Sequence, residues 1–259
     1  MAAPRSTVGA SIVGPTSALA LKLAAFTKLS EDDRHALARA ITNVRTVDAR
    51  RDLTTEGERP RFVHVILEGW ASAYKTLPDG KRQIVAFFVP GDFCDLNVYV
   101  LRQRDHSIGA VSRLKVAMMS PDEMASLSVG RPGLTQALWW EGLVTAAIQR
   151  EWMLNLGQRT ARERIAHLLI ELYLRLRTVG LTRDGGCDFP LTQNDIADAT
   201  GLTAVHVNRT LQELRREELI ELERKQLQIF DLARMMDGAM FNANYLHLNR
   251  EGRHLDTNE

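Results

Sequence analysis

The spacing of hydrophobic and polar residues changes along the chain and divides it into regions. Residues 29–41 carry apolar side chains at helical spacing behind Ser30, which is a good helix-capping residue. Between residues 44 and 119 the pattern becomes a series of short β-rich runs, and helical spacing returns at Pro121. The pattern therefore predicts a short helix, then a β domain, then a helical C-terminal part.

The β-rich runs are short and evenly spaced, and turn sequences at residues 78–80 and 90–92 separate some of them. The runs occupy residues 61–69, 70–77, 82–89, 106–112 and 114–119. Strands arranged in this way are typical of an all-β sandwich or barrel.

The longest helical signal begins at Pro132, a residue that suits the first turn, and continues to about Leu156, which makes about six to seven turns. Its apolar stripe comprises Leu134, Leu138, Val144 or Thr145, Ile148, Trp152 and Leu156. One face of this helix can cover the β domain while another needs a second partner, for which a twofold-related copy of the chain is the natural choice. An ordinary core helix is the alternative, because a stripe does not identify its partner. After Gly157 a second amphipathic helix runs to Gly180.

Residues 189–222 contain the signals of two short helices joined by a tight turn. Thr192 can cap the first helix, with Asp195 three residues later to complement its exposed amides. Gly201 can end that helix in a left-handed conformation, and Thr203 can cap the second helix. This arrangement predicts a helix-turn-helix, although a capped helix pair is also common packing.

The second helix of this pair has an inward face and an outward face. Its inward side chains are those of Val207, Leu211 and Leu214, and its outward side chains are those of Ala204, Val205, Asn208 and Arg209. Asparagine can pair with adenine and arginine with guanine, so the outward face is suited to reading DNA bases. Apolar runs at residues 219–222 and 227–230 around Arg224 and Lys225 add a two-stranded wing with a basic tip. The segment therefore reads as a winged helix.

Composition limits the remaining functional classes. The chain has 259 residues, of which 45% are hydrophobic and 25% charged, as is typical of soluble globular proteins. It has no apolar run long enough for a membrane span and no signal-peptide pattern at its start, so we expect it in the cytoplasm without a membrane partner. The formal net charge is only +1, so nucleic-acid binding requires a local basic patch.

The order of short helix, β-roll, long helix, hinge and winged helix resembles the Crp/Fnr family of bacterial transcription regulators. The residues that carry the resemblance are 160–176 and 189–222, with Gly91–Phe93 and the flanking strands adding weaker support. The resemblance implies an α+β fold with an N-terminal β-roll of the jelly-roll-like, cyclic-nucleotide-binding type, a long dimerisation helix and a C-terminal winged helix-turn-helix. We divide the chain into a flexible tail (1–17), a sensory β-roll (18–130), the dimerisation helix (131–157), the DNA-binding domain (158–235) and a C-terminal helix or tail (236–259).

The same resemblance assigns roles in binding double-stranded DNA. Arg209 occupies the family's base-reading position, and Asn208, Val205 and Ala204 lie beside it. The residues at positions that contact phosphates in the family are Thr203, His206, Gln193, Asn194, Arg162 and Lys225. Val205 replaces a glutamate of well-known members and offers only an apolar surface, so we expect a different operator.

For the homodimer, the resemblance points to Leu138, Ile148, Trp152 and Leu156 on the long helix. The family's effector pocket maps onto Asp95, His106, Ser107, Gln149 and Arg150. The arginine that neutralises a bound phosphate in the family is replaced by His106, so cyclic AMP is disfavoured as the effector. No cofactor is predicted, the effector is unknown, and RNA polymerase is an expected further partner.

Other sensor chemistries and an enzymatic function receive little support. Cys94 and Cys187 are the only cysteines, too few for a cysteine-ligated iron–sulfur cluster, although Cys187 could be oxidation-sensitive. His64, His106 and Cys94 are available as haem ligands, but a lone histidine on a strand is usually an ordinary core or surface residue. A metal-dependent, cupin-like enzyme would need paired histidines and a carboxylate that the sequence does not spell out, so we expect neither a metal site nor catalysis.

Overall fold

The computed structural model describes residues 17–41, 43–96 and 98–248. Most of the expected N-terminal tail and the last eleven residues of the chain lie outside these ranges. Helix α2 (Ala18–Phe26), which the sequence pattern did not reveal, is capped by Ser17. Helix α3 (Glu31–Ala40) follows it. Ser30 caps α3 through a capping box with Asp33, as predicted. None of the helices in the described ranges is long and apolar enough to cross a membrane.

The β domain consists of two antiparallel four-stranded sheets. One sheet has the order β1-β8-β3-β6, and the other has the order β2-β7-β4-β5. The strands are β1 (Asn43–Val47), β2 (Asp52–Thr54), β3 (Val63–Glu68), β4 (Ala71–Thr76), β5 (Arg82–Phe88), β6 (Phe93–Cys94), β7 (Ser107–Ala110) and β8 (Leu114–Met119). A short 3₁₀ helix, η1 (Val98–Val100), lies between β6 and β7. Apolar side chains between the sheets, such as Ile66, Ile108 and Val116, form the interior of this β-roll.

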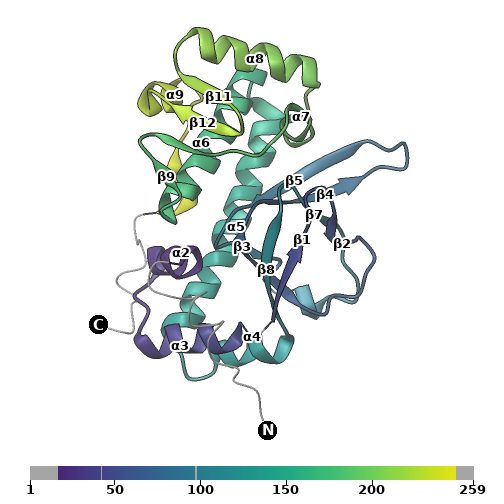
Figure 1. Ribbon diagram of the computed structural model, residues 1–259, viewed down its shortest axis with the longest axis vertical. Helices are drawn as coiled ribbons and strands as arrows, with labels where there is room; N and C mark the ends of the chain where they lie inside the picture. The colour runs from purple at the N-terminus through teal and green to yellow at the C-terminus, as the bar shows by residue number, and fades with distance from the viewer. Residues whose placement is uncertain (1–16, 42, 97, 249–259) are drawn as a thin grey trace.

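Helices cover the outer face of the first sheet. Val63 and Val65 of β3 pack with α2, α3, α4 (Pro121–Ser128) and the start of α5 (Pro132–Gln158). The turn before β6 approaches α2 so closely that a Cβ on Gly91, which has φ +94°, would lie 2.8 Å from the carbonyl oxygen of Ala18. Only glycine fits this turn without a backbone shift. Figure 1 shows α5 running from these helices to the opposite end of the molecule.

The C-terminal part is a winged helix built on α6 (Ala161–Thr178), as the sequence predicts. Its other elements are β9 (Thr182–Arg183), β10 (Gly186–Asp188), α7 (Gln193–Thr200), α8 (Ala204–Arg216), β11 (Ile220–Glu223), β12 (Gln226–Ile229), α9 (Leu232–Gly238) and η2 (Ala243–Leu246). Strands β9 and β10, which the sequence pattern did not indicate, join the wing hairpin in a sheet of order β11-β12-β10-β9. The turn of the wing places Arg224 and Lys225 at positive φ, which gives the tight two-residue hairpin its basic tip.

Candidate nucleic-acid interface

The helix-turn-helix has the caps that the sequence predicts. The hydroxyl of Thr192 accepts a hydrogen bond from the Asp195 amide at 3.2 Å, and the Asp195 carboxylate accepts one from the Thr192 amide at 2.9 Å. Gly201 ends α7 at φ +67°, and the Thr203 hydroxyl then accepts from the His206 amide at 3.2 Å. These caps fix the angle between α7 and α8 because each helix begins or ends at a defined residue.

Helix α8 presents two different faces. Val207, Leu211 and Leu214 are buried against α6 and the wing, as predicted. On the opposite face Val205 is 81% exposed and Arg209 is also exposed, while Ala204 and Asn208 are half-buried. Arg209 lies along the helix surface, with its guanidinium 3.0 Å from Nε2 of His206. A surface contact of this kind is weak, so the guanidinium is free to turn outward towards a partner.

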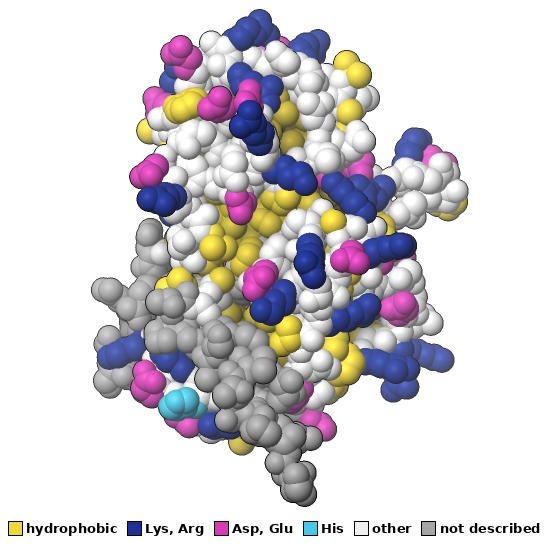
Figure 2. Space-filling view, viewed as in Figure 1, with side chains coloured by type: hydrophobic (Ala, Val, Ile, Leu, Met, Phe, Trp, Pro, Cys, Tyr) yellow, Lys and Arg dark blue, Asp and Glu magenta, His cyan; other side chains and the backbone are white. Residues whose placement is uncertain are grey.

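The residues at the family's phosphate-contact positions are distributed around this face. Thr203, Asn194 and Lys225 are exposed, and Gln193 and His206 are half-buried. Arg162 differs, because both ends of its guanidinium bind Glu217, at 2.8 and 2.7 Å. Figure 2 shows Lys and Arg side chains interspersed with Asp and Glu over the winged-helix end rather than a uniform basic surface.

An ion-pair group joins α7 to the β-roll. Arg50 binds Asp195 through both nitrogens, at 2.8 and 2.9 Å, and Arg82 binds Asp195 at 3.3 Å and Asp198 at 2.7 Å. Burial raises the pKa of Asp195, but the hydrogen bonds from Arg50 and Thr192 outweigh it and hold the pKa below its usual range. The side chain that caps α7 therefore also anchors the winged helix to the β-roll.

Three of the expected effector-pocket residues lie together, but not as an open phosphate site. Asp95 lies 3.0 Å from Nε2 of His106 and 3.2 Å from the guanidinium of Arg104. Arg104 is buried, and the sequence pattern did not indicate a role for it. The contact with Asp95 raises the pKa of His106 against the opposing effect of burial, and Asp105 adds to the rise. The Ser107 hydroxyl accepts a hydrogen bond from the Glu56 amide at 2.9 Å. Asp95 is therefore already engaged by Arg104 and His106, and the Ser107 hydroxyl by the Glu56 amide.

The other two expected effector-pocket residues are not part of this group. Gln149 on α5 donates to the carbonyl oxygen of Val85 at 3.3 Å, and Arg150 points to solvent. Within the described chain neither makes a hydrogen bond or ion pair with Asp95, His106 or Ser107. The expectation that all five line one pocket is not met in this conformation of the single chain.

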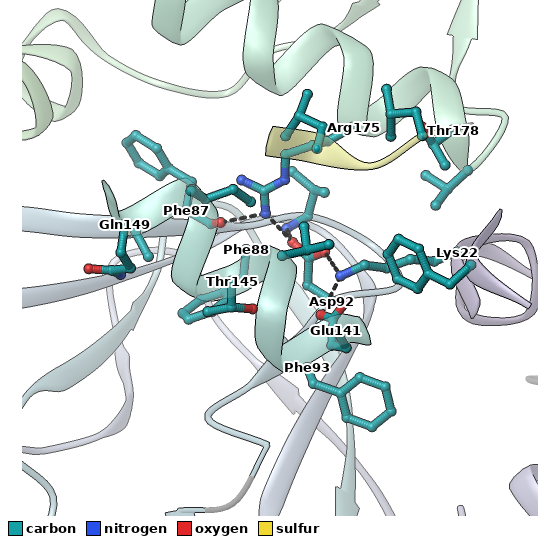
Figure 3. A pocket seen from close by; sticks show the side chains of 18 residues that line it. Lys22, Phe87, Phe88, Asp92, Phe93, Glu141, Thr145, Gln149, Arg175 and Thr178 are labelled. Carbon is teal, nitrogen blue, oxygen red and sulfur yellow. Dashed lines mark hydrogen bonds and ion pairs between the residues drawn. The ribbon is translucent and has the colours of Figure 1, made fainter. Parts of the chain in front are cut away.

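Gln149 instead lines a cavity at the junction of α2, α5, α6 and β5. Figure 3 shows the buried charges at its base: Lys22 binds both Asp92 and Glu141, and Arg175 of α6 binds Asp92 at 2.6 Å. Burial raises the pKa of Glu141, and the attraction of Lys22 does not fully offset it. For Asp92 the balance is reversed, because Arg175 and Lys22 outweigh burial and hold the pKa low. The cluster connects the β-roll to α6 through buried charges.

The long helix buries part of the stripe that we assigned to the dimer. Leu138 is 5% exposed and packs under the first sheet, and Trp152 is 7% exposed, with its indole N–H donating to Glu171 at 3.1 Å. Ile148 packs against the interior of the same chain, while Leu156 is partly exposed. Leu138 and Trp152 face this chain's own core. We assigned them to the dimer because an apolar stripe alone does not distinguish a face buried within one chain from a face buried between two chains. The most exposed apolar residues of α5 are Trp139, Leu143 and Met153, each one position from a buried residue, while Leu154 and Leu156 are less exposed.

The two thiols are buried and free. Burial, with a contribution from Asp188, raises the pKa of Cys187 to about 12, and burial also raises the pKa of Cys94. A thiol with a raised pKa is a poor nucleophile, so this conformation does not favour a redox role for Cys187. Among the described residues no group of three or more His, Cys, Asp or Glu side chains could hold a metal ion.

Comparison with known proteins matches both halves of the chain. Residues 44–129 match the cyclic nucleotide-binding domain family, and residues 163–237 match the Crp-like helix-turn-helix domain family. The transcriptional activator protein FnrL of Cereibacter sphaeroides is 32% identical over 200 residues, which cover 75% of this chain and 79% of that protein. The nitrogen fixation regulation protein FixK of Bradyrhizobium diazoefficiens is 32% identical over 193 residues, 73% of this chain and 76% of that protein.

A solved structure shows the same fold. That of FixK2 from Bradyrhizobium japonicum superimposes with a TM-score of 0.67 at 25% identity, covering 75% of this chain and 96% of the other. The two family matches occur in the expected order, and the relatives align across the boundary between them. The capped helix pair and its wing agree with the second match. The chain belongs to the Crp/Fnr family of DNA-binding transcription regulators.

Proposed function

We propose that the protein acts as a homodimer that reads a near-palindromic DNA operator with helix α8. The outward face of that helix carries the argument, because Val205 and Arg209 are exposed next to Asn208 while the opposite face is buried. Arg209 would donate two hydrogen bonds to guanine, Asn208 would serve adenine, and Val205 and Ala204 would contact a thymine methyl group. Thr203, His206, Gln193, Asn194 and Lys225 would hold the phosphate backbone and fix the register.

Arg162 requires a rearrangement before it can act on a phosphate. Its two bonds to Glu217 are of the strong, charge-assisted kind, and Arg234 lies 3.9 Å from the same carboxylate. Arg162 would exchange Glu217 for a phosphate only where DNA passes close to both residues. Its contribution to affinity is therefore expected to be smaller than that of Lys225, whose side chain has no ion-pair partner among the described residues.

The proposed dimer uses the solvent-facing stripe of α5. Trp139, Leu143 and Met153 are 71%, 61% and 66% exposed, and with Ala146, Arg150 and Gly157 they alternate by four and three residues. This heptad spacing is the pattern by which two parallel helices pack along a shared seam. Twofold pairing along α5 would carry two winged helices to half-sites about 34–36 Å apart.

Cyclic AMP is not the proposed effector. A buried phosphodiester needs a cation, and the buried candidate, Arg104, already binds Asp95. We infer that operator binding needs no added cyclic nucleotide. The relatives named as transcriptional activators support a role at promoters, where RNA polymerase would be the further partner and the cytoplasm the site of action.

Binding-site selection from random DNA by the purified full-length protein tests the proposal. We expect recovery of a single inverted repeat without added nucleotide. Calorimetry with cyclic AMP and cyclic GMP, paired with operator titrations in the presence of each, tests the effector. Recovery of no sequence preference would reject operator reading, and saturable nucleotide binding that increases operator affinity would reject the effector statement alone.

A further inference from the structure

One end of the β-roll contains a cavity with an unusual concentration of arginine. It has a volume of about 410 Å³ and opens where β1, β2, β3 and the segment before β7 meet. The residues that matter for its chemistry are Arg45, Arg59, Arg61, Arg104, Thr54 and His64. We call it the arginine cavity. Its volume lies within the range of about 300–1,000 Å³ typical of small-molecule sites.

The rim of the arginine cavity is positively charged. Arg45, Arg59 and Arg61 are exposed, and none of them forms an ion pair with any described residue. Glu58 is the only carboxylate among the lining residues, and one of its oxygens already accepts from the Thr55 amide at 3.3 Å. Three guanidiniums against one carboxylate leave an excess of two positive charges at the rim. Arg104 adds no net charge, because Asp95 neutralises it.

The base of the cavity contains polar groups that no protein group satisfies. Thr54 is 7% exposed and His64 is 4% exposed, yet Oγ1 of Thr54 and Nδ1 of His64 have no hydrogen-bond partner. Burial, together with the nearby Arg104 and Arg45, lowers the pKa of His64 to about 4, so the ring is neutral near pH 7. Buried polar atoms without partners are costly and uncommon in proteins. Two of them at the base of one cavity indicate a site that a ligand completes.

Arg104 lies at the base beside these two groups, paired with Asp95 and therefore without net charge to offer. Its side chain is 2% exposed, and its two terminal nitrogens bind the Asp95 carboxylate and the carbonyl oxygen of Phe62, both at 3.2 Å. A guanidinium held in this way is positioned before any ligand arrives, so little side-chain entropy is lost on binding. The positive charge therefore comes from the rim, and the base adds the Thr54 hydroxyl and the neutral His64 ring beside the paired Arg104.

We propose that the arginine cavity binds a small anion with two or more negative charges carried by phosphate or carboxylate groups. The rim arginines would hold the charged groups, and the Thr54 hydroxyl and the His64 ring would bind polar atoms at the inner end. The cavity adjoins the cyclic-nucleotide cradle through the Arg104–Asp95 pair, but Asp95, His106 and Ser107 do not line it. It is separate from α8 and does not depend on operator binding.

Calorimetry on the full-length protein without DNA tests this site, with pyrophosphate and citrate as the probes. At low ionic strength we expect saturable binding of at least one probe, and a chloride buffer of matched ionic strength provides the baseline. Arg61→Gln and Arg59→Gln should each weaken binding roughly threefold to tenfold, as expected for charged contacts at a solvent-exposed rim. Arg113→Gln is the matched control, because Arg113 is exposed on the same domain, has no ion pair with a described residue and lies outside the cavity. Failure of both probes to bind, or equal binding by the Arg61 and Arg113 variants, overturns the proposal.

Thr54→Val separates a ligand site from a merely structural one. Valine has nearly the same shape as threonine but no hydroxyl, so it removes an unsatisfied buried oxygen and the melting temperature should stay equal or rise. Binding of the probe should nevertheless weaken severalfold. A variant that melts at or above the wild-type temperature and binds the probe unchanged shows that the base of the cavity makes no contact with the ligand and rejects that part of the assignment.

Discussion

At the scale of single residues, Arg209 and Lys225 are expected to contribute to DNA binding in different ways. Arg209→Ala should cost about 1–3 kcal/mol per half-site and flatten the preference at one base pair, because two hydrogen bonds to a base edge are lost. Lys225→Ala, at the tip of the wing, should weaken binding to all sequences alike. Binding-site selection with both variants distinguishes the two effects. If the Arg209 variant kept the complete wild-type preference, α8 would not be the recognition helix.

His106 should make stability depend on pH near neutrality. Its pKa is raised in the folded protein, mainly by Asp95, whereas an unfolded histidine titrates near 6.5. The contribution is fully present below about pH 6.5 and is lost as the pH rises through the folded-state pKa. Urea denaturation between about pH 6 and 8 should therefore show wild type losing stability relative to His106→Gln as the pH rises. Parallel curves for the two proteins would contradict the assigned Asp95 contact.

At the scale of secondary-structure elements, the Arg50–Asp195 pair should couple the β-roll to α7. The pair is bidentate, but Arg50 is about half exposed, so solvent reduces its strength. A double-mutant cycle with Arg50→Ala and Asp195→Ala, measured by urea denaturation, should give a coupling energy of about 1 kcal/mol. The surface pair Lys81–Asp79 in the β4–β5 turn is the control and should show no measurable coupling. Equal coupling in the two cycles would mean that the contact does not hold the domains together.

The buried charges beneath α6 should be more sensitive to substitution. Arg175 binds both Asp92 and Glu171, so Arg175→Met leaves two buried carboxylates without this cation and should cost on the order of 3–5 kcal/mol of unfolding free energy. Glu141→Gln should cost about 1 kcal/mol or less, because glutamine removes a charge that burial disfavours and Lys22 keeps Asp92 as its partner. Urea denaturation of both variants measures the difference. A similar loss in the two would show that the cluster is not organised around Arg175.

At the scale of the whole molecule, the sequence revealed local features such as helix caps but not the contacts between residues far apart in the chain. The caps at Ser30, Thr192 and Thr203 and the left-handed Gly201 are local, because their partners lie within a few residues, and each was predictable. The Arg50–Asp195 and Arg104–Asp95 pairs leave no periodic pattern, since chain folding alone brings their members together. Helix α5 shows why a stripe was insufficient: both of its faces are apolar, and only the packed structure identifies the face that is already covered.

The exposed face of α5 leads to a prediction about assembly. Leu143→Glu and Met153→Glu place charges on the solvent-facing stripe, so they should leave the fold intact but produce monomers that bind an inverted repeat far more weakly, because the two half-sites are no longer held by one molecule. Glu218→Gln is a control that alters an exposed charge in the turn after α8, away from the stripe. Light scattering gives the oligomeric state, and operator titration gives the affinity of each variant.

Trp152→Glu should instead unfold the protein, since the Trp152 indole packs on Phe87 at a ring distance of 6.0 Å inside one chain. Dimers that persist in both stripe variants, or a folded monomeric Trp152 variant, would move the subunit interface back to the stripe of Leu138 and Trp152.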